Sequence, residues 1–380
     1  MEGIDNSELS RRLLEIPLFR EINNALRGQS GPVDWKIAGE IGGAVAASGM
    51  RSGKPSAADL EEFNQACRIA ELAVVGHTGL GPVQGVTDVR LLWRTQWAQV
   101  NLDSLKPLIE RLASKLSGHA AAGPGLGPAA PLISAISPFL MGSQVGLVIG
   151  YMSHKALGVW DLCLPRTPPG RLYFNYPNIL DVERDLGIKP QEFRMWLALH
   201  EVSHELHFQA VSWIRPYLVG LIEQYMDAAE IDTSQLASRM GNLSDPQELS
   251  AFMQRPEDLF PLLRSPAQEG LVEKILCCTS AAEGYSDWIV RKAGLGLTES
   301  FDKIAEGMTR RRAERSSPER MMEKMFGLDL GNEQQRRGHR FVTTIAEAGG
   351  LEHLWQKPEN LPDLGELAQP NRWLSRIGPK

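Results

Sequence analysis

Apolar residues recur three and four positions apart along most of the chain, which is the spacing of one face of an α-helix. We therefore predict a mainly α fold. Pro190 begins one such pattern, at a position where proline suits the first turn of a helix, and the apolar residues that follow predict a buried central helix. The predicted helices cover residues 58–75, 101–116, 190–214, 268–293, 300–312 and 334–348.

Residues 138–152 form a further apolar segment, which contains several glycines and no charged side chain. Ser143 and Gln144 interrupt the segment, and it is shorter than the roughly 20 predominantly apolar residues that a transmembrane helix needs. We therefore expect a buried, glycine-rich helix at 138–152 rather than a membrane span.

A small β element is expected at residues 171–176, RLYFNY, where Pro177 and Asn178 would end the strand. The edge of this strand could bind an extended peptide, although a purely structural strand fits the pattern equally well. Glycines and prolines at 118–131 predict a surface loop. We expect a helical N-terminal region, residues 1–165, to pack on a catalytic region, residues 166–380.

Charge and cysteine content limit the classes of partner and the compartment. The chain has 380 residues, with 40 basic and 46 acidic side chains and a net charge of -6, so neither a nucleic acid nor a membrane surface is expected as a partner. The four cysteines form no C-x-x-C pair, and the first residues lack the basic start and apolar run of a signal peptide. We expect reduced thiols and a cytoplasmic protein.

The predicted central helix contains an H-E-x-x-H motif, His200-Glu201-Val202-Ser203-His204. Histidines four residues apart project from one helical face, where both imidazoles can bind the same zinc ion. The glutamate beside the first histidine can then act as the base that deprotonates water. His207 is not expected to bind the ion, because it lies about 10 Å along the helix axis from His200.

A hydrolytic zinc site needs a third protein ligand, and two glutamates are candidates. Glu223 and Glu283 are each followed four residues later by an aspartate, Asp227 or Asp287. In either pair the aspartate, one turn further on, could accept the N–H of a ligating histidine. Small neighbours would let the helix of Glu283 approach the first helix closely and so favour it, but this argument leaves both glutamates open.

Three other side chains could stabilise the negative charge that develops on a carbonyl oxygen during hydrolysis. These are Tyr285, His339 and Arg340, each of which carries a group able to donate a hydrogen bond. Each could equally be a packing or surface residue.

The sequence resembles a known family, the bacterial zinc-dependent metalloproteases of unknown substrate that are sometimes associated with deazaflavin-coenzyme biosynthesis. The resemblance implies a zincin-like core with His200, His204 and Glu283 as zinc ligands and Glu201 as base, as in thermolysin-type peptidases. His204 and Glu283 are 79 residues apart (283 − 204), which predicts a helical insertion between them. The resemblance rests on GPVDWKIAGEI, LGVWDLCLP, LYFNYPNI, FRMWLALHEVSHELHF, AAEGYSDWIV and ENLPDLGELAQPNRWLSRI.

These residues predict a zinc-dependent hydrolase that cleaves an amide bond of a peptide or protein substrate. Glu201 would take a proton from water and return it to the leaving amine. The alternative is a non-catalytic protein in which zinc orders the fold or a degenerate cleft binds a partner. Glu201 argues against that alternative, because a structural zinc site has no use for a base at this position.

Overall fold

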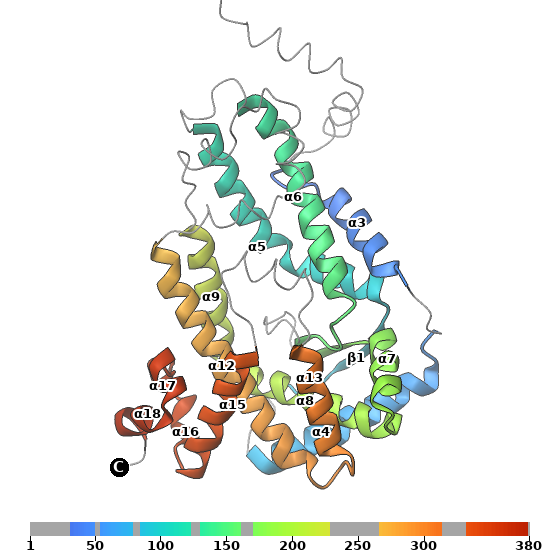
Figure 1. The fold of residues 1–380 in the computed structure, drawn as a ribbon, viewed down its shortest axis with the longest axis vertical. Coiled ribbons are helices and arrows are strands. Elements are labelled where there is room, and N and C mark those ends of the chain that lie inside the picture. The colour runs from blue at the N-terminus through green and yellow to red at the C-terminus, as the bar shows by residue number, and fades with distance from the viewer. Residues whose placement is uncertain are drawn as a thin grey trace, which may run out of the picture.

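The computed structural model describes residues 31–49, 54–78, 84–122, 130–160, 170–228, 266–313 and 332–378. Within these ranges the fold is mainly α with a small parallel sheet, which confirms the predicted fold class. Figure 1 shows an upper layer of three helices, α3 (Trp35–Ala47), α5 (Arg94–Ala122) and α6 (Ala130–Met152), above a lower body built around α8 (Pro190–Ala210).

The central helix of the lower body is α8, in which nearly every residue from Phe193 to Phe208 is buried. A helix that is buried on all sides must be covered by neighbouring elements on all sides. Helices α4 (Ala57–Thr78), α7 (Tyr176–Leu186), α12 (Pro266–Gly294) and α13 (Phe301–Ala313) pack against it. The H-E-x-x-H motif therefore lies in the core of the lower body.

The predicted helix at 190–214 proves to be two helices. The first, α8, ends at Ala210, and α9 (Ile214–Asp227) begins after three intervening residues. Pro216 favours this break, because proline lacks an N–H and destabilises a helix less in the first turn than in the interior. Helix α9 occupies part of the predicted helical insertion, and residues 229–265 of that insertion lie outside the described residues.

The sheet has two parallel strands, β1 (Asp88–Leu92) and β2 (Arg171–Asn175), with Asp88 opposite Arg171 and Leu92 opposite Asn175. The predicted strand at 171–176 is therefore confirmed except for Tyr176, which begins α7. Pro177 suits the first turn of that helix. β1 was not predicted from the sequence; its five residues, DVRLL, alternate between polar and apolar only as far as Leu91.

The three helices of the upper layer share a second hydrophobic core, in which α6 approaches α3 closely. A Cβ atom at Gly146 would lie 2.4 Å from the carbonyl oxygen of Ala38, so only glycine fits this crossing. The predicted helix at 138–152 is thus confirmed. Among the described residues, no helix has the length and apolar character needed to cross a membrane.

The expectation of a loop at 118–131 is partly wrong. Helix α5 begins at Arg94, accommodates Pro107 and continues to Ala122, and α6 begins at Ala130. Alanine has the highest helix propensity, and the three alanines at 120–122 extend α5 beyond Gly118. The remaining residues of the predicted loop, 123–129, lie outside the described residues.

The C-terminal elements pack beside α12. They are α15 (Asn332–Glu347), α16 (Leu351–Leu354), a short 3-10 helix at Pro358–Asn360, α17 (Leu364–Ala368) and α18 (Pro370–Ile377). A capping box formed by Asp363 and Glu366 begins α17. The fully buried Trp373 of α18 donates its indole N–H to the Asn360 carbonyl at 2.6 Å, which fixes α18 against the 3-10 helix.

Helix α4 belongs to the same hydrophobic core as α8, although it precedes residue 165. Phe63, Cys67 and Ala70 of α4 are buried in this core, whereas α3, α5 and α6 have their own core. The described part of the first region therefore contributes to both layers of the molecule. The division at residue 165 stays a prediction.

Candidate metal centre

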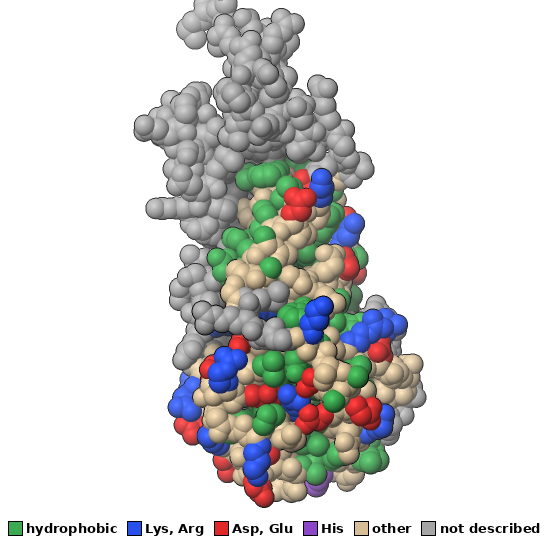
Figure 2. Space-filling view, turned by 90° about the vertical axis from the view of Figure 1, so that its right-hand side faces the viewer, with side chains coloured by type: hydrophobic (Ala, Val, Ile, Leu, Met, Phe, Trp, Pro, Cys, Tyr) green, Lys and Arg blue, Asp and Glu red, His purple; other side chains and the backbone are tan. Residues whose placement is uncertain are grey.

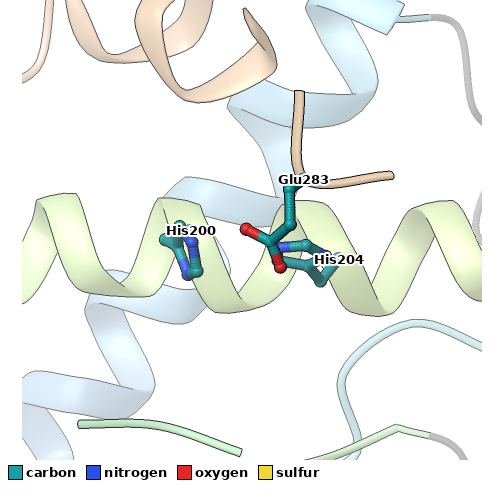
Figure 3. Close-up of side chains that lie close together, drawn as sticks. All are labelled: His200, His204 and Glu283. Carbon is teal, nitrogen blue, oxygen red and sulfur yellow. The ribbon is translucent and has the colours of Figure 1, made fainter. Parts of the chain in front are cut away.

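Helices α8 and α12 bring His200, His204 and Glu283 together at one point of the core. One potential ligand atom from each side chain lies within 4.8 Å of the others, and Figure 3 shows the carboxylate of Glu283 facing the two imidazoles. His204 Nε2 is 3.5 Å from Glu283 Oε1. Both histidines are buried, and Glu283 is half-buried.

The residues of this cluster fit a zinc ion. Both ring nitrogens of His204 are buried and make no hydrogen bond within the described part of the chain. A buried polar group without a partner is costly, and a cation bound to one of these nitrogens would lower that cost. Two imidazoles and one carboxylate form a ligand set that zinc favours, and three protein ligands leave one coordination position open for catalysis.

Aromatic stacking holds the two imidazoles in place. Trp196, one turn before His200 on α8, stacks on the His200 ring at a centroid distance of 5.7 Å. Trp160 stacks on the His204 ring at 5.6 Å. Because each imidazole is packed against an indole, its orientation is set before any ligand binds.

A hydrogen bond joins the two helices of the cluster beside the candidate ligands. The hydroxyl groups of Ser203 on α8 and Ser286 on α12 form a hydrogen bond with each other, and both residues are buried. The Ser203 hydroxyl also donates to the His200 carbonyl oxygen at 2.8 Å. The hydrogen bond between Ser203 and Ser286 fixes the position of α12, and with it that of Glu283, relative to the two histidines.

The alternative third ligand, Glu223, lies elsewhere. Arg111 of α5 pairs with Glu223 at 3.6 Å and also binds Asp227, and all three side chains are about half exposed. Glu223 is not part of the cluster around His200 and His204. The structure thus groups the preferred glutamate, Glu283, with the histidines.

The reason that favoured Glu283 in the sequence needs correction in part. Four small residues were expected to let α12 approach α8: Ser280, Ala281, Ala282 and Gly284. Of these, Gly284 and the backbone of Ser280 lie against α15 instead. A Cβ atom at Gly284 would lie 2.3 Å from the carbonyl oxygen of Gly338, and one at Gly338 would lie 2.0 Å from that of Ser280. The small side chains therefore permit close packing between α12 and α15.

The candidate base Glu201 is fully buried beside the cluster. Its Oε2 atom accepts hydrogen bonds from the backbone N–H groups of Val159, at 2.8 Å, and Trp160, at 3.1 Å. Its Oε1 atom lies 3.3 Å from His200 Nδ1. These contacts hold the carboxylate beside His200.

Asp287 was expected to accept an N–H from a ligating histidine. The side chain is half-buried, and within the described residues no hydrogen bond or ion pair joins it to His200 or His204. His200 Nδ1 lies 3.3 Å from a carboxylate oxygen of Glu201. The supporting role of Asp287 stays a prediction.

Tyr285 lies within an aromatic cluster together with His207. Its ring contacts His207, Trp288 and Trp355, and burial raises the pKa of its hydroxyl group well above the ordinary value. His207 is fully buried, and burial, with a smaller contribution from His204, holds the pKa of its ring well below the usual value. The clustered ligand atoms are those of His200, His204 and Glu283.

The two remaining candidates lie on α15. Arg340 is exposed and donates to the Ala368 carbonyl, which ties α15 to α17. His339 is half-buried and directly follows Gly338, whose backbone packs against Gly284 beside Glu283. The predicted roles of Tyr285, His339 and Arg340 in charge stabilisation stay predictions.

The sequence did not identify three residues that lie around the candidate metal centre: Gly158, Trp160 and Trp196. Trp196 precedes His200 by four residues, so helical spacing alone could have indicated that the two rings stack. Gly158 and Trp160 belong to the segment LGVWDLCLP, which carries part of the family resemblance. No pattern of residues in the sequence predicts that this segment contacts α8.

Comparisons with known proteins bear on the family and the fold of the chain. A family model described as zincin-like metallopeptidase matches residues 33–374. The chain is also similar to the crystal structure of a protein from Chloroflexus aurantiacus that is described as a candidate hydrolase with a novel fold. The identity is 24%, the TM-score is 0.68, and the match covers 90% of this chain and 98% of the other. At this identity the likeness shows the fold alone. No curated protein matches the chain.

Proposed function

The chain belongs to the zincin-like metallopeptidase family, and on this premise we propose that it is a zinc-dependent hydrolase that cleaves an amide bond in a peptide or protein. One observation carries the proposal: Glu283 meets His200 and His204 in the core although it follows His204 by 79 residues (283 − 204). The link to deazaflavin-coenzyme biosynthesis and the cytoplasmic location stay predictions.

In the proposed reaction His200, His204 and Glu283 hold the metal. Zinc in such a site supplies Lewis acidity, which polarises a carbonyl group and lowers the pKa of water. Glu201 takes a proton from the attacking water and returns it to the leaving nitrogen, so one carboxylate serves as base and then as acid. The buried position of Glu201 keeps this proton transfer away from bulk solvent.

The ligand set favours this reaction over a purely structural zinc. Structural zinc sites are closed by four protein ligands, whereas catalytic sites use three. Among the described residues, three potential ligands form the cluster, and a carboxylate that is not one of them lies beside it. That arrangement provides both an open coordination position and a base.

Metal analysis together with a cleavage assay tests the proposal. After reconstitution, the protein should carry about one zinc per chain and cleave members of a peptide library. Glu201→Gln should keep the zinc and lose cleavage by about 100-fold or more, because the amide cannot accept the proton. A parent protein that binds no transition metal, or a Glu201→Gln variant as active as the parent, would rule the mechanism out.

A further inference from the structure

The segment at residues 153–160, which we call the strap, leads from the end of α6 to the candidate metal centre. It has no regular helix or strand until Trp160, whose ring stacks on His204. The Leu157 carbonyl accepts the N–H of Asn175, the last residue of β2. The strap therefore lies between the sheet and α8, against Glu201.

The strap binds one of the two carboxylate oxygens of Glu201. Oε2 accepts both backbone N–H groups, from Val159 and Trp160, while Oε1 is directed to the side of His200. The two oxygens therefore have different surroundings. Two fixed donors occupy Oε2, and Oε1 is the oxygen on the side of the candidate ligands.

Gly158 makes this contact possible. A Cβ atom at this position would lie 2.1 Å from the carboxyl carbon of Glu201, and 2.3 Å and 2.4 Å from its two oxygens. The φ angle of Gly158 is outside the left-handed region, so the backbone itself would accept alanine. Glycine is thus required at 158 by the proximity of the carboxylate rather than by backbone conformation.

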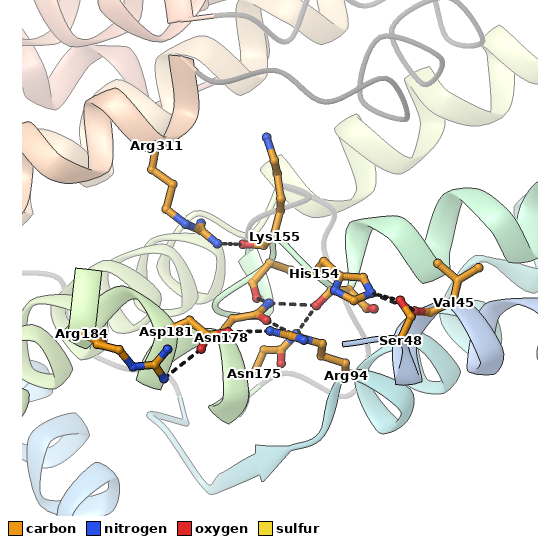
Figure 4. Close-up of polar contacts among 12 residues, drawn as sticks. Val45, Ser48, Arg94, His154, Lys155, Asn175, Asn178, Asp181, Arg184 and Arg311 are labelled. Carbon is orange, nitrogen blue, oxygen red and sulfur yellow. Dashed lines mark hydrogen bonds and ion pairs between the residues drawn. The ribbon is translucent and has the colours of Figure 1, made fainter. Parts of the chain in front are cut away.

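Buried polar contacts fix the strap from its other side (Figure 4). The Asn178 amide donates to the carbonyls of Ser153, at 2.8 Å, and Ala156, at 2.6 Å. The Asn178 side-chain oxygen in turn accepts from Arg94 Nε at 2.6 Å, and Arg94 pairs with Asp181 at 2.7 Å. The strap is held to α5 and α7 by this chain of contacts.

Two further side chains donate hydrogen bonds to backbone carbonyls of the strap. Arg311 of α13 donates to the Lys155 carbonyl at 2.7 Å, as Figure 4 shows. The Trp97 indole of α5 donates to the Gly158 carbonyl at 3.2 Å. Donors held by a rigid frame need little reorganisation during a reaction, so this frame suits a positioning role.

We propose that the strap positions the base of the hydrolase: the N–H groups of Val159 and Trp160 hold Glu201 Oε2, and Oε1 transfers the proton. This proposal rests on the proposed function. Gly158 is then a positioning residue, because it acts through the carboxylate for which it leaves room. Misplacement of a catalytic group by about 1 Å can reduce a rate about 100-fold.

Amide hydrogen exchange of the metal-free protein tests the contact independently of activity. In Glu201→Ala the amides of Val159 and Trp160 lose their acceptor and should exchange at least about tenfold faster than in the parent. Glu205→Ala is the matched control, because Glu205 is also buried on α8 but accepts the Gly170 N–H, at 2.7 Å. It should release Gly170 and leave Val159 and Trp160 protected.

The catalytic half of the proposal is tested with Gly158→Ala. The variant should bind zinc within about threefold of the parent in a chelator competition, since the ligands are unchanged, and should lose about 100-fold in kcat with little change in KM. Gly76→Ala is the control, because a Cβ at Gly76 meets no atom within 4 Å. It should behave like the parent.

Each result either supports the proposal or overturns it. Unchanged exchange of Val159 and Trp160 in Glu201→Ala, or an unchanged kcat in Gly158→Ala, overturns the positioning role and leaves the proposed function intact. A parent protein that neither binds zinc nor cleaves peptides overturns both. If Gly158→Ala does not fold, the exchange data for Glu201→Ala decide the question alone.

Discussion

At the scale of single residues, two glutamates with the same local sequence pattern have different surroundings. Glu223 and Glu283 are each followed by an aspartate four residues on, yet Glu223 pairs with an exposed arginine and Glu283 lies beside His204. A glutamate in an exposed ion pair contributes little to stability. A glutamate beside two buried imidazoles can instead complete a metal site.

Removal of each carboxylate should therefore affect zinc binding differently. Glu283→Ala should weaken zinc binding by more than about 100-fold. This exceeds the roughly 10- to 100-fold loss expected for Asp287→Ala, which removes the predicted supporting carboxylate. Glu223→Ala is the matched control and should bind zinc like the parent. Competition with a chelator measures all three affinities, and loss of zinc from Glu223→Ala but not from Glu283→Ala would place the third ligand on α9.

At the scale of elements, two different faces of α12 contact two different helices. One face brings Glu283 and Ser286 to α8, and another packs against α15 through Ser280 and Gly284. The second face contains small residues because the two helix backbones approach closely there. The position of Glu283 thus depends on a helix contact in which Glu283 takes no part.

A side chain added at this contact should push α12 and α15 apart. We expect Gly284→Ala to lower the free energy of unfolding by about 1–3 kcal/mol, the usual cost of overpacking. Gly270→Ala, on the same helix but with no atom within 4 Å of the added Cβ, should be neutral or stabilising because alanine favours helix. Urea unfolding of both variants measures the difference, and equal stabilities would show that the backbones can separate without cost.

At the scale of the whole molecule, a buried arginine connects three helices of the lower body. Arg194 of α8 binds Glu183 of α7 at 2.8 Å and pairs with Glu62 and Asp59 of α4. Arg194 and Glu183 are buried, and burial raises the pKa of Glu183 despite the nearby guanidinium. The arginine thus joins α4 to α7 and α8.

Loss of this connection should destabilise the lower body as a whole. Arg194→Met leaves the buried carboxylate of Glu183 without its cation, which typically costs about 3–5 kcal/mol in the free energy of unfolding. Arg111→Met, which removes the exposed partner of Glu223 and Asp227, should unfold at the parent's urea concentration. If both variants unfold at the same concentration, the buried cluster does not hold α4 to the body.

The order of residues over short stretches of the sequence determines most of the long helices and half of the candidate metal site. Helical periodicity predicts most of the long helices, because a buried stripe must recur with the turn of the helix. The four-residue spacing of His200 and His204 likewise places both on one face of α8. These features depend on residues close together in the chain, so the sequence alone is sufficient to predict them.

Only the tertiary structure decided which distant groups meet. The pairing of β1 with β2, the packing of α12 on α15, and the contact of the strap with Glu201 all join segments that are far apart in sequence. The sequence left Glu223 and Glu283 as alternatives, and the structure separates them through Arg111 and the position of α12. Such contacts depend on the packing of whole helices, which the periodicity of one segment does not specify.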